Sequence, residues 1–368
     1  MSGRRRPLSL PDFPWDSLTP YAATAGRHDG GIVDLSVGTP VDPTPDAVRD
    51  ALSAASDAHG YPQTHGTPAL REAVAAWFAR RRGVPDVDPA AVLPTIGSKE
   101  LVAWLPTLLG LGEGSTVVVP PIAYPTYDIG ARLAGAVPLP AGALTQVGPA
   151  SAELVWVNSP SNPTGQVLGA RHLAKVVAWA RGRGAVVASD ECYAELGWDG
   201  TEVPSILDPR VCGGSHQGLL ALYSLSKQST MAGYRAAFAA GDPVLVAELL
   251  AVRKHAGMIV PAPVQAAMTV ALGDDAHVTA QRQVYGRRRE ALLPALQAAG
   301  FAVEHSGAGL YLWATRDEDC WETVGWLAER GILVAPGDFY GQAGRRHVRV
   351  ALTATDERVE AACRRLAG

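Results

Sequence analysis

The sequence predicts an α/β fold with a mostly parallel sheet of seven strands. Short apolar runs rich in β-branched residues alternate with longer segments of helical pattern, as expected where helices connect parallel strands. The apolar residues in these runs are continuous and do not alternate with polar ones, which is typical of strands covered by helices on both faces. The predicted strands are 90–95, 115–120, 135–140, 153–158, 184–190, 218–224 and 235–240.

Two of the connecting segments are predicted as helices. The first covers residues 98–109 and starts directly after a strand. The second covers residues 168–184 and ends in Gly182 and Gly184, because glycine commonly follows the last turn of a helix.

The pattern changes after Pro261 and Pro263. One long helix is predicted from there to about Ala299, followed by short strands and a last helix from Thr355. This order is typical of a smaller α+β unit. The short strands are expected near 301–305, 310–315, 331–336 and 347–352.

The chain of 368 residues is long enough for two domains with well-buried cores. We predict a large α/β domain over 45–258, and a small α+β domain formed by 1–44 and 259–368 together. No repeat or low-complexity linker separates the two parts, so we expect them to share an extensive interface.

Charge and apolar patterning argue against nucleic acid and membrane as partners. The formal net charge of −4 gives no field that attracts nucleic acid, and the basic run at 4–6 is short and terminal, as in a solvated tail. No apolar run approaches the roughly 18 residues of a membrane span. The cysteines lack metal-type spacing, so we expect reduced thiols and a cytoplasmic location. They are Cys192, Cys212, Cys320 and Cys363.

Lys227 is unusual because this chain uses arginine almost wherever it carries a positive charge. Of its 32 basic residues, only Lys99, Lys175, Lys227 and Lys254 are lysines. An amine that attacks a carbonyl cannot be replaced by arginine, because a guanidinium does not lose its proton. Burial and a neighbouring cation such as Arg235 would lower the pKa of the Lys227 amine. The other lysines have simpler explanations as helix residues, so we predict Lys227 as the reactive amine.

Polar residues directly follow several predicted strands, which is where ligands bind in an open α/β sheet. Gly97, Ser98 and Lys99 open a helix, so their backbone N–H groups could hold a phosphate, although a simple N-cap explains the same residues. The only asparagines of the chain, Asn158 and Asn162, share one loop. They fit either a structural turn or a ligand-facing amide.

Asp190 ends another predicted strand, where a carboxylate needs a cation or strong donors. A structural salt bridge is one explanation and a ligand is the other. Together these groups match the parts of pyridoxal 5'-phosphate (PLP). The amine matches its aldehyde, the acid its pyridine nitrogen, the phosphate cradle its phosphate, and the aromatic loop 120–127 its ring face.

These motifs occur in the order seen in a known enzyme family. From about Leu35 to the last helix the chain resembles the class I and II aminotransferases, which implies the PLP-dependent transferase fold type I. The N-terminal half is similar to actinobacterial N-succinyldiaminopimelate aminotransferases of lysine biosynthesis. The motifs are LSVGTP (35–40), YPQTHGTPALREAVAAWF (61–78), TIGSKE (95–100), PPIAYPTY (120–127), NSPSNPTG (158–165), SDECY (189–193), SLSKQSTMAGYR (224–235) and HVRVAL (347–352).

The resemblance implies roles for the residues around the cofactor ring. Lys227 would bind the PLP aldehyde covalently, and Asp190 would hold the pyridine nitrogen protonated. Tyr193 and Asn162 would donate hydrogen bonds to the phenolate oxygen of the ring, and Tyr124 would stack on the ring.

The resemblance also implies a phosphate site and a carboxylate site. Tyr61 would reach the phosphate of the neighbouring subunit in a homodimer. Arg349 would bind the substrate α-carboxylate through two hydrogen bonds, with Asn162 beside it and the Gly38 region as the opposite wall. Lys99 departs from many relatives, which carry a small or polar residue there. The phosphate-site candidates are Gly97, Ser98, Lys99, Ser224, Ser226 and Arg235.

The reaction implied by the resemblance is a ping-pong transamination. Glutamate would donate the amino group and leave as 2-oxoglutarate, and N-succinyl-2-amino-6-oxopimelate would accept it. Rival readings of the same fold are an aminotransferase for other amino acids and a C–S β-lyase. Candidates for binding the distal groups of the substrate are Arg27, His28, His65 and the loop 307–311.

Two readings from other classes fit the sequence less well. A regulatory protein with an aminotransferase-like sensor would need a DNA-binding module before Leu35, where the segment is short and broken by proline. A nucleotide site would need a GxxxxGK[ST] loop, which the sequence lacks.

Overall fold

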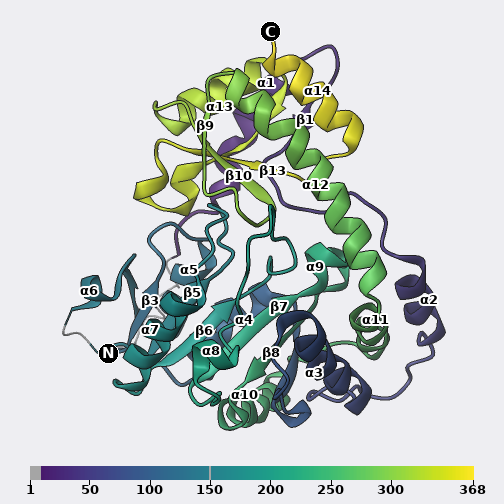
Figure 1. Cartoon of the computed structure of the whole chain (residues 1–368), viewed down its shortest axis with the longest axis vertical. Helices are drawn as coiled ribbons and strands as arrows, with labels where there is room; N and C mark the ends of the chain where they lie inside the picture. The colour runs from purple at the N-terminus through teal and green to yellow at the C-terminus, as the bar shows by residue number, and fades with distance from the viewer. Residues whose placement is uncertain (1–9, 149–150) are drawn as a thin grey trace, which may run out of the picture.

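The computed structural model describes residues 10–148 and 151–368, so the basic run at 4–6 lies outside the described residues. Figure 1 shows a larger part around a seven-stranded sheet and a smaller part around a four-stranded sheet. The long helix α12 (Asp275–Ala298) runs from the smaller part down to the larger one.

The large sheet confirms the predicted α/β fold class. Its strand order is β2-β8-β7-β6-β5-β3-β4, and all neighbouring strands are parallel except where β8 is one of the pair. Each predicted run overlaps one of these strands, and β2 and β8 each extend one residue beyond the predicted end. The strands are β2 (Val92–Ile96), β3 (Thr116–Val119), β4 (Val137–Pro140), β5 (Leu154–Asn158), β6 (Val186–Asp190), β7 (Leu219–Ser224) and β8 (Ala236–Gly241).

Helices cover both faces of this sheet, and β5 shows how. Val155 and Val157 pack into a core that includes Leu173 of α7. On the opposite face, the Trp156 ring lies against Tyr127 of α5, with 5.1 Å between ring centroids. Both faces are therefore buried, which explains why residues 154–157 are apolar without alternation.

The two helices predicted in the larger part are both present. The predicted helix 98–109 is α4, and the predicted helix 168–184 is the shorter α7. The helices are α2 (Asp46–Ala54), α3 (Pro68–Arg82), α4 (Ser98–Leu108), α5 (Thr126–Ala134), α6 (Leu144–Val147), α7 (Ala170–Arg181), α8 (Pro209–Cys212), α9 (Leu225–Gln228), α10 (Pro243–Ala256) and α11 (Ala262–Gly273).

The smaller part contains a four-stranded antiparallel sheet and a short parallel pair. The N-terminal strand β1 pairs with β11, so the two ends of the chain fold together. The strands are β1 (Val33–Asp34), β9 (Ala302–Glu304), β10 (Tyr311–Thr315), β11 (Ile332–Leu333), β12 (Ala335–Pro336) and β13 (Val348–Ala351), and the helices besides α12 are α1 (Thr19–Ala25), α13 (Cys320–Glu329) and α14 (Asp356–Leu366).

The single long helix predicted up to Ala299 is wrong, because the chain forms α11 and α12 in its place. Asp274 separates them with an extended backbone (φ −112°, ψ 105°). Its side chain accepts a hydrogen bond from the Ala276 N–H at 2.8 Å, so it caps the second helix. α11 packs against α2 and α3 of the larger part. The predicted domain boundaries at 44/45 and 258/259 stay a prediction.

The single strand predicted over 331–336 is divided into β11 and β12. β11 pairs with β1, whereas β12 pairs with β13 of the four-stranded sheet. The chain passes from one sheet to the other at Val334, which is buried. An apolar run by itself does not indicate such a change of partner.

Within residues 10–148 and 151–368, no helix has both the length and the apolar character to cross a membrane. In the same residues, no group of three or more His, Cys, Asp or Glu side chains is placed to hold a metal ion. All four cysteines are free thiols.

Candidate active site

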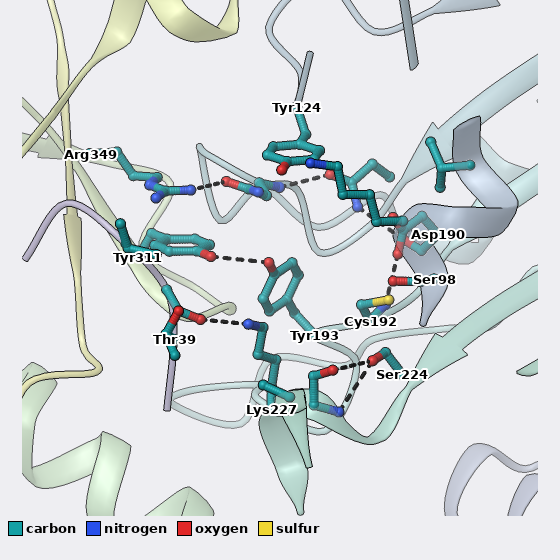
Figure 2. A pocket seen from close by; sticks show the side chains of 18 of the residues that line it. Thr39, Ser98, Tyr124, Asp190, Cys192, Tyr193, Ser224, Lys227, Tyr311 and Arg349 are labelled. Carbon is teal, nitrogen blue, oxygen red and sulfur yellow. Dashed lines mark hydrogen bonds between the residues drawn. The ribbon is translucent and has the colours of Figure 1, made fainter. Parts of the chain in front are cut away.

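A cavity of about 700 Å³ lies where the polar strand ends of the large sheet meet the smaller part. β5, β6 and β7 are parallel, and Asn158 lies opposite Asp190 in the register, so these strands end side by side. Figure 2 shows Lys227, Asp190, Tyr124 and Arg349 around one common space. The predicted residues that line it are Gly38, Ser98, Lys99, Tyr124, Asn162, Asp190, Tyr193, Ser224, Ser226, Lys227, Arg235 and Arg349.

Lys227 lies on α9, which follows β7 without a break. Its Nζ donates a hydrogen bond to the carbonyl oxygen of Gly38, across the cavity from its own helix. Burial lowers the pKa of the Lys227 amine, and the positive charges of Arg349 and Arg235 lower it further. A lowered pKa makes the neutral, nucleophilic amine easier to form.

The lowered pKa of Lys227 predicts a pH dependence for cofactor uptake. The amine must lose its proton before it attacks an aldehyde, so the rate at which apoprotein takes up PLP should rise with pH. It should level off below pH 10.5, the ordinary pKa of a lysine amine. The measurement is the rate of PLP uptake as a function of pH, followed by stopped-flow absorbance and compared with the reaction of PLP with a free amine. A midpoint at or above that value would contradict the assignment.

Asp190 at the end of β6 is held by two donors. The hydroxyl of Tyr127 donates to Asp190 Oδ2 at 2.7 Å, and the backbone N–H of Cys192 donates to Oδ1 at 3.1 Å. Among the described residues Asp190 forms no ion pair, so the structural salt bridge considered above is absent. An oriented carboxylate that faces a cavity is suited to accept a hydrogen bond from a protonated pyridine nitrogen.

Arg349 of β13 is almost fully buried, with 2% of its surface exposed. Its Nη1 donates to Asn162 Oδ1 at 2.9 Å, and its Nη2 donates to the Ser36 carbonyl at 2.6 Å. Its guanidinium lies 4.0 Å from the ring centroid of Tyr311. No described carboxylate pairs with it, and a buried, unpaired cation that lines a cavity is suited to bind an anion.

The two asparagines are held in different ways. The Asn158 amide donates to the carbonyls of Pro160 and Asp190, and its Oδ1 accepts from the backbone N–H of Asn162 at 2.8 Å. Asn158 therefore fixes the loop, as the interpretation of this segment as a structural turn predicts. Asn162 is held by its backbone and by Arg349, and it lines the cavity.

The N-terminus of α4 forms a tight pocket with Arg235. Gly97 has φ +75°, and a Cβ atom there would lie 2.1 Å from Arg235 Nη2, so only glycine allows the guanidinium to approach so closely. Ser224 and Ser226 lie nearby on β7 and α9, with 2.8 Å between their hydroxyl oxygens. Helix N–H groups, hydroxyls and a guanidinium are the donors that a phosphate requires, so the residues present fit PLP.

Two predicted phosphate-site residues are placed differently from the rest. The Lys99 side chain is exposed and its Nζ lies 5.4 Å from the ring centroid of Tyr124 and 5.7 Å from that of Phe13. Tyr61 is fully exposed in this single chain and does not line the cavity. Its predicted role across a subunit interface stays a prediction.

Sequence reasoning did not single out several residues that line the cavity. Tyr311 was named only as part of the candidate loop 307–311 and the predicted strand 310–315, and its hydroxyl lies 3.2 Å from that of Tyr193. Burial opposes ionisation of Tyr311, but the positive charges of Arg349 and Lys227 outweigh it and lower its pKa. Burial raises the pKa of Tyr193, which therefore stays a neutral donor. Other missed lining residues are Phe13, Trp15, Tyr127 and Cys192.

The candidates for binding distal substrate groups are mostly remote from the cavity. Arg27 bonds to Thr24, His28 caps Gly30, and His65 bonds to a carbonyl, and none of the three lines the cavity. Only the loop 307–311 contributes, through Tyr311.

Comparisons with known proteins agree with this site. The family model for aminotransferase class I and II matches residues 31–366. A probable aminotransferase of Mycobacterium tuberculosis is 66% identical over 97% of this chain and 85% of that protein. The 4-dedimethylamino-4-oxo-anhydrotetracycline transaminase OxyQ of Streptomyces rimosus is 60% identical over 97% of this chain and 99% of that protein.

A solved structure has the same fold. It is that of a probable N-succinyldiaminopimelate aminotransferase from Thermus thermophilus, with a TM-score of 0.86, 30% identity, and coverage of 96% of this chain and 99% of that one. The fold and these relatives define an enzyme that transfers amino groups. The chain belongs to the class I and II aminotransferase family, and its cofactor is PLP. Enzymes of this family act on amino and oxo acids and are typically dimers.

Proposed function

We propose that this aminotransferase acts on N-succinyl-LL-2,6-diaminopimelate and 2-oxoglutarate, in the biosynthesis of diaminopimelate and lysine. The Thermus relative, whose name carries this activity, supports the proposal. The observation that carries it in this chain is Lys99, a cation without an acidic partner among the described residues, at the mouth of the cavity. Both proposed substrates carry a second anionic group beyond the reacting centre.

Each cavity residue has a proposed task. When bound, PLP supplies an electrophilic aldehyde carbon and an electron-withdrawing ring. Lys227 supplies the amine that holds this aldehyde and moves the proton at the substrate Cα. Asp190 holds the ring nitrogen protonated.

The remaining proposed tasks concern orientation. Tyr193 and Asn162 donate hydrogen bonds to the ring oxygen, and Tyr124 packs on one ring face. Arg349 binds the α-carboxylate of either substrate, and the Gly38 backbone forms the opposite wall.

The proposed assembly is a homodimer in which Tyr61 reaches the phosphate of the neighbouring subunit. Its complete exposure in the single chain supports a covered position in an assembly, since a fully exposed aromatic side chain is uncommon. The proposed cytoplasmic location rests on the four free thiols.

Lys99→Met tests the distal-anion part of the proposal. Because Lys99 is exposed, we expect a moderate loss of about 3- to 10-fold in kcat/KM for glutamate and for N-succinyl-diaminopimelate. Alanine, which lacks a distal anion, should react at the parent rate. An equal loss for alanine would indicate that Lys99 supports the cofactor and does not select the substrate.

The alternative is an aminotransferase for other amino acids or a C–S β-lyase of the same fold. The similarity to OxyQ, whose name describes a different oxo substrate, keeps the first of these open. Product analysis separates the β-lyase from the aminotransferases, and a screen of oxo acid acceptors separates the aminotransferases from one another. An aminotransferase releases 2-oxoglutarate from glutamate, whereas a β-lyase releases pyruvate, ammonia and homocysteine from cystathionine.

A further inference from the structure

A buried ion pair lies beneath the N-terminus of α4. Arg253 of α10 has no exposed surface, and its two terminal nitrogens donate to the Glu100 carboxylate at 2.7 and 3.2 Å. The same carboxylate accepts a hydrogen bond from the Ile96 N–H at 3.2 Å. Glu100 therefore fixes the turn between β2 and α4, in which Gly97 faces Arg235.

This carboxylate has two opposite electrostatic effects. In the first turn of a helix it is favourable, because it interacts with the N–H groups at the positive end of the helix dipole. Toward a phosphate at the same helix end it is repulsive. Only 14% of the Glu100 side chain is exposed, so water and salt screen this repulsion weakly.

Arg253 removes the unfavourable effect. Its charge is opposite and in direct contact with Glu100, and a hydrogen bond from its Nη2 to the Met258 carbonyl at 3.2 Å holds it in place. The intact pair presents no net charge to the phosphate site. The turn thus keeps its carboxylate cap without losing affinity for an anion.

We propose that Arg253 is a positioning residue for the cofactor phosphate, which it never touches, and that it acts by neutralising Glu100. The proposal rests on the phosphate placement given under the proposed function. It predicts that single substitutions at the two positions change PLP affinity in opposite directions, because one leaves an unpaired anion and the other an unpaired cation.

Binding of PLP and of pyridoxal, which lacks the phosphate, to apoprotein tests this without measuring turnover. Arg253→Met should raise the Kd for PLP by about tenfold and leave that for pyridoxal nearly unchanged. Glu100→Gln should lower the Kd for PLP. The double variant should return PLP affinity to near the parent value. Should Arg253→Met fail to fold, the Glu100→Gln and double variants still decide the matter.

The outcomes that would overturn the proposal are distinct. Three results would contradict the proposal: equal losses of affinity for PLP and pyridoxal, a higher Kd for PLP in Glu100→Gln, or a double variant that binds PLP no better than Arg253→Met. Each would indicate that the pair only stabilises the fold. Arg81→Met is the matched control, because Arg81 also pairs through two nitrogens with a buried carboxylate, Glu195, away from α4. It should leave the ratio of the two Kd values unchanged.

Ser98→Ala separates this proposal from the phosphate placement on which it rests. If Ser98→Ala weakens PLP but not pyridoxal, while the Arg253 and Glu100 variants do not change the ratio, only the present inference fails. If Ser98→Ala also leaves the ratio unchanged, the placement of the phosphate at α4 is wrong.

Discussion

Lys227→Arg is expected to abolish transamination. The substitution keeps a positive charge and a side chain of similar length, but the guanidinium cannot lose its proton under any condition in which the fold persists. It can therefore neither attack the cofactor aldehyde nor move the proton at the substrate Cα. We expect a fall in the rate of the glutamate half-reaction by about 10⁴-fold, measured as 2-oxoglutarate released in a single turnover.

Lys254→Arg is the matched control, because Lys254 is an exposed residue near the end of α10. This variant should catalyse the half-reaction at the parent rate. Borohydride reduction of the holoprotein, followed by peptide mapping, locates the covalent attachment independently of activity. A reduced adduct on any other lysine, or parental turnover in Lys227→Arg, would contradict the assignment.

The strand ends of the large sheet could be predicted because they obey a local rule. A continuous apolar run predicts a buried parallel strand, and the residue that follows it lies at the ligand-binding edge. This rule brings Asn158 and Asp190 to one edge, as the register of β5 and β6 shows, and Lys227 lies on α9 directly after the neighbouring strand β7. The chemistry of Lys227 followed from its residue type in a chain that otherwise uses arginine.

The other walls of the cavity could not be predicted in this way, because they come from distant parts of the chain. Phe13 and Trp15 reach the cavity from the N-terminal segment, and Tyr311 reaches it from β10. Their placement depends on how the smaller part packs on the larger one. The break between α11 and α12, where Asp274 caps α12, could not be predicted either. The apolar periodicity is the same for one continuous helix and for two consecutive helices.

Arg349→Lys should have the second largest effect. A lysine has one nitrogen where Arg349 has three, so it cannot keep its bonds to Asn162 and Ser36 and also bind both oxygens of a carboxylate. The site is buried, so the loss is not screened by water. We expect about 2–5 kcal/mol less transition-state stabilisation, which is about 30- to 5000-fold in kcat/KM.

The pattern of this loss across substrates distinguishes Arg349 from Lys99. Every amino donor and oxo acceptor carries the α-carboxylate, so Arg349→Lys should reduce kcat/KM for glutamate and alanine by the same factor. Lys99→Met should change the ratio of the two. Arg364→Lys, on the exposed face of α14, controls for the substitution type. If Arg349→Lys lowered kcat/KM for glutamate far more than for alanine, Arg349 would bind the distal group, and the orientation of the substrate in the cavity would have to be reversed.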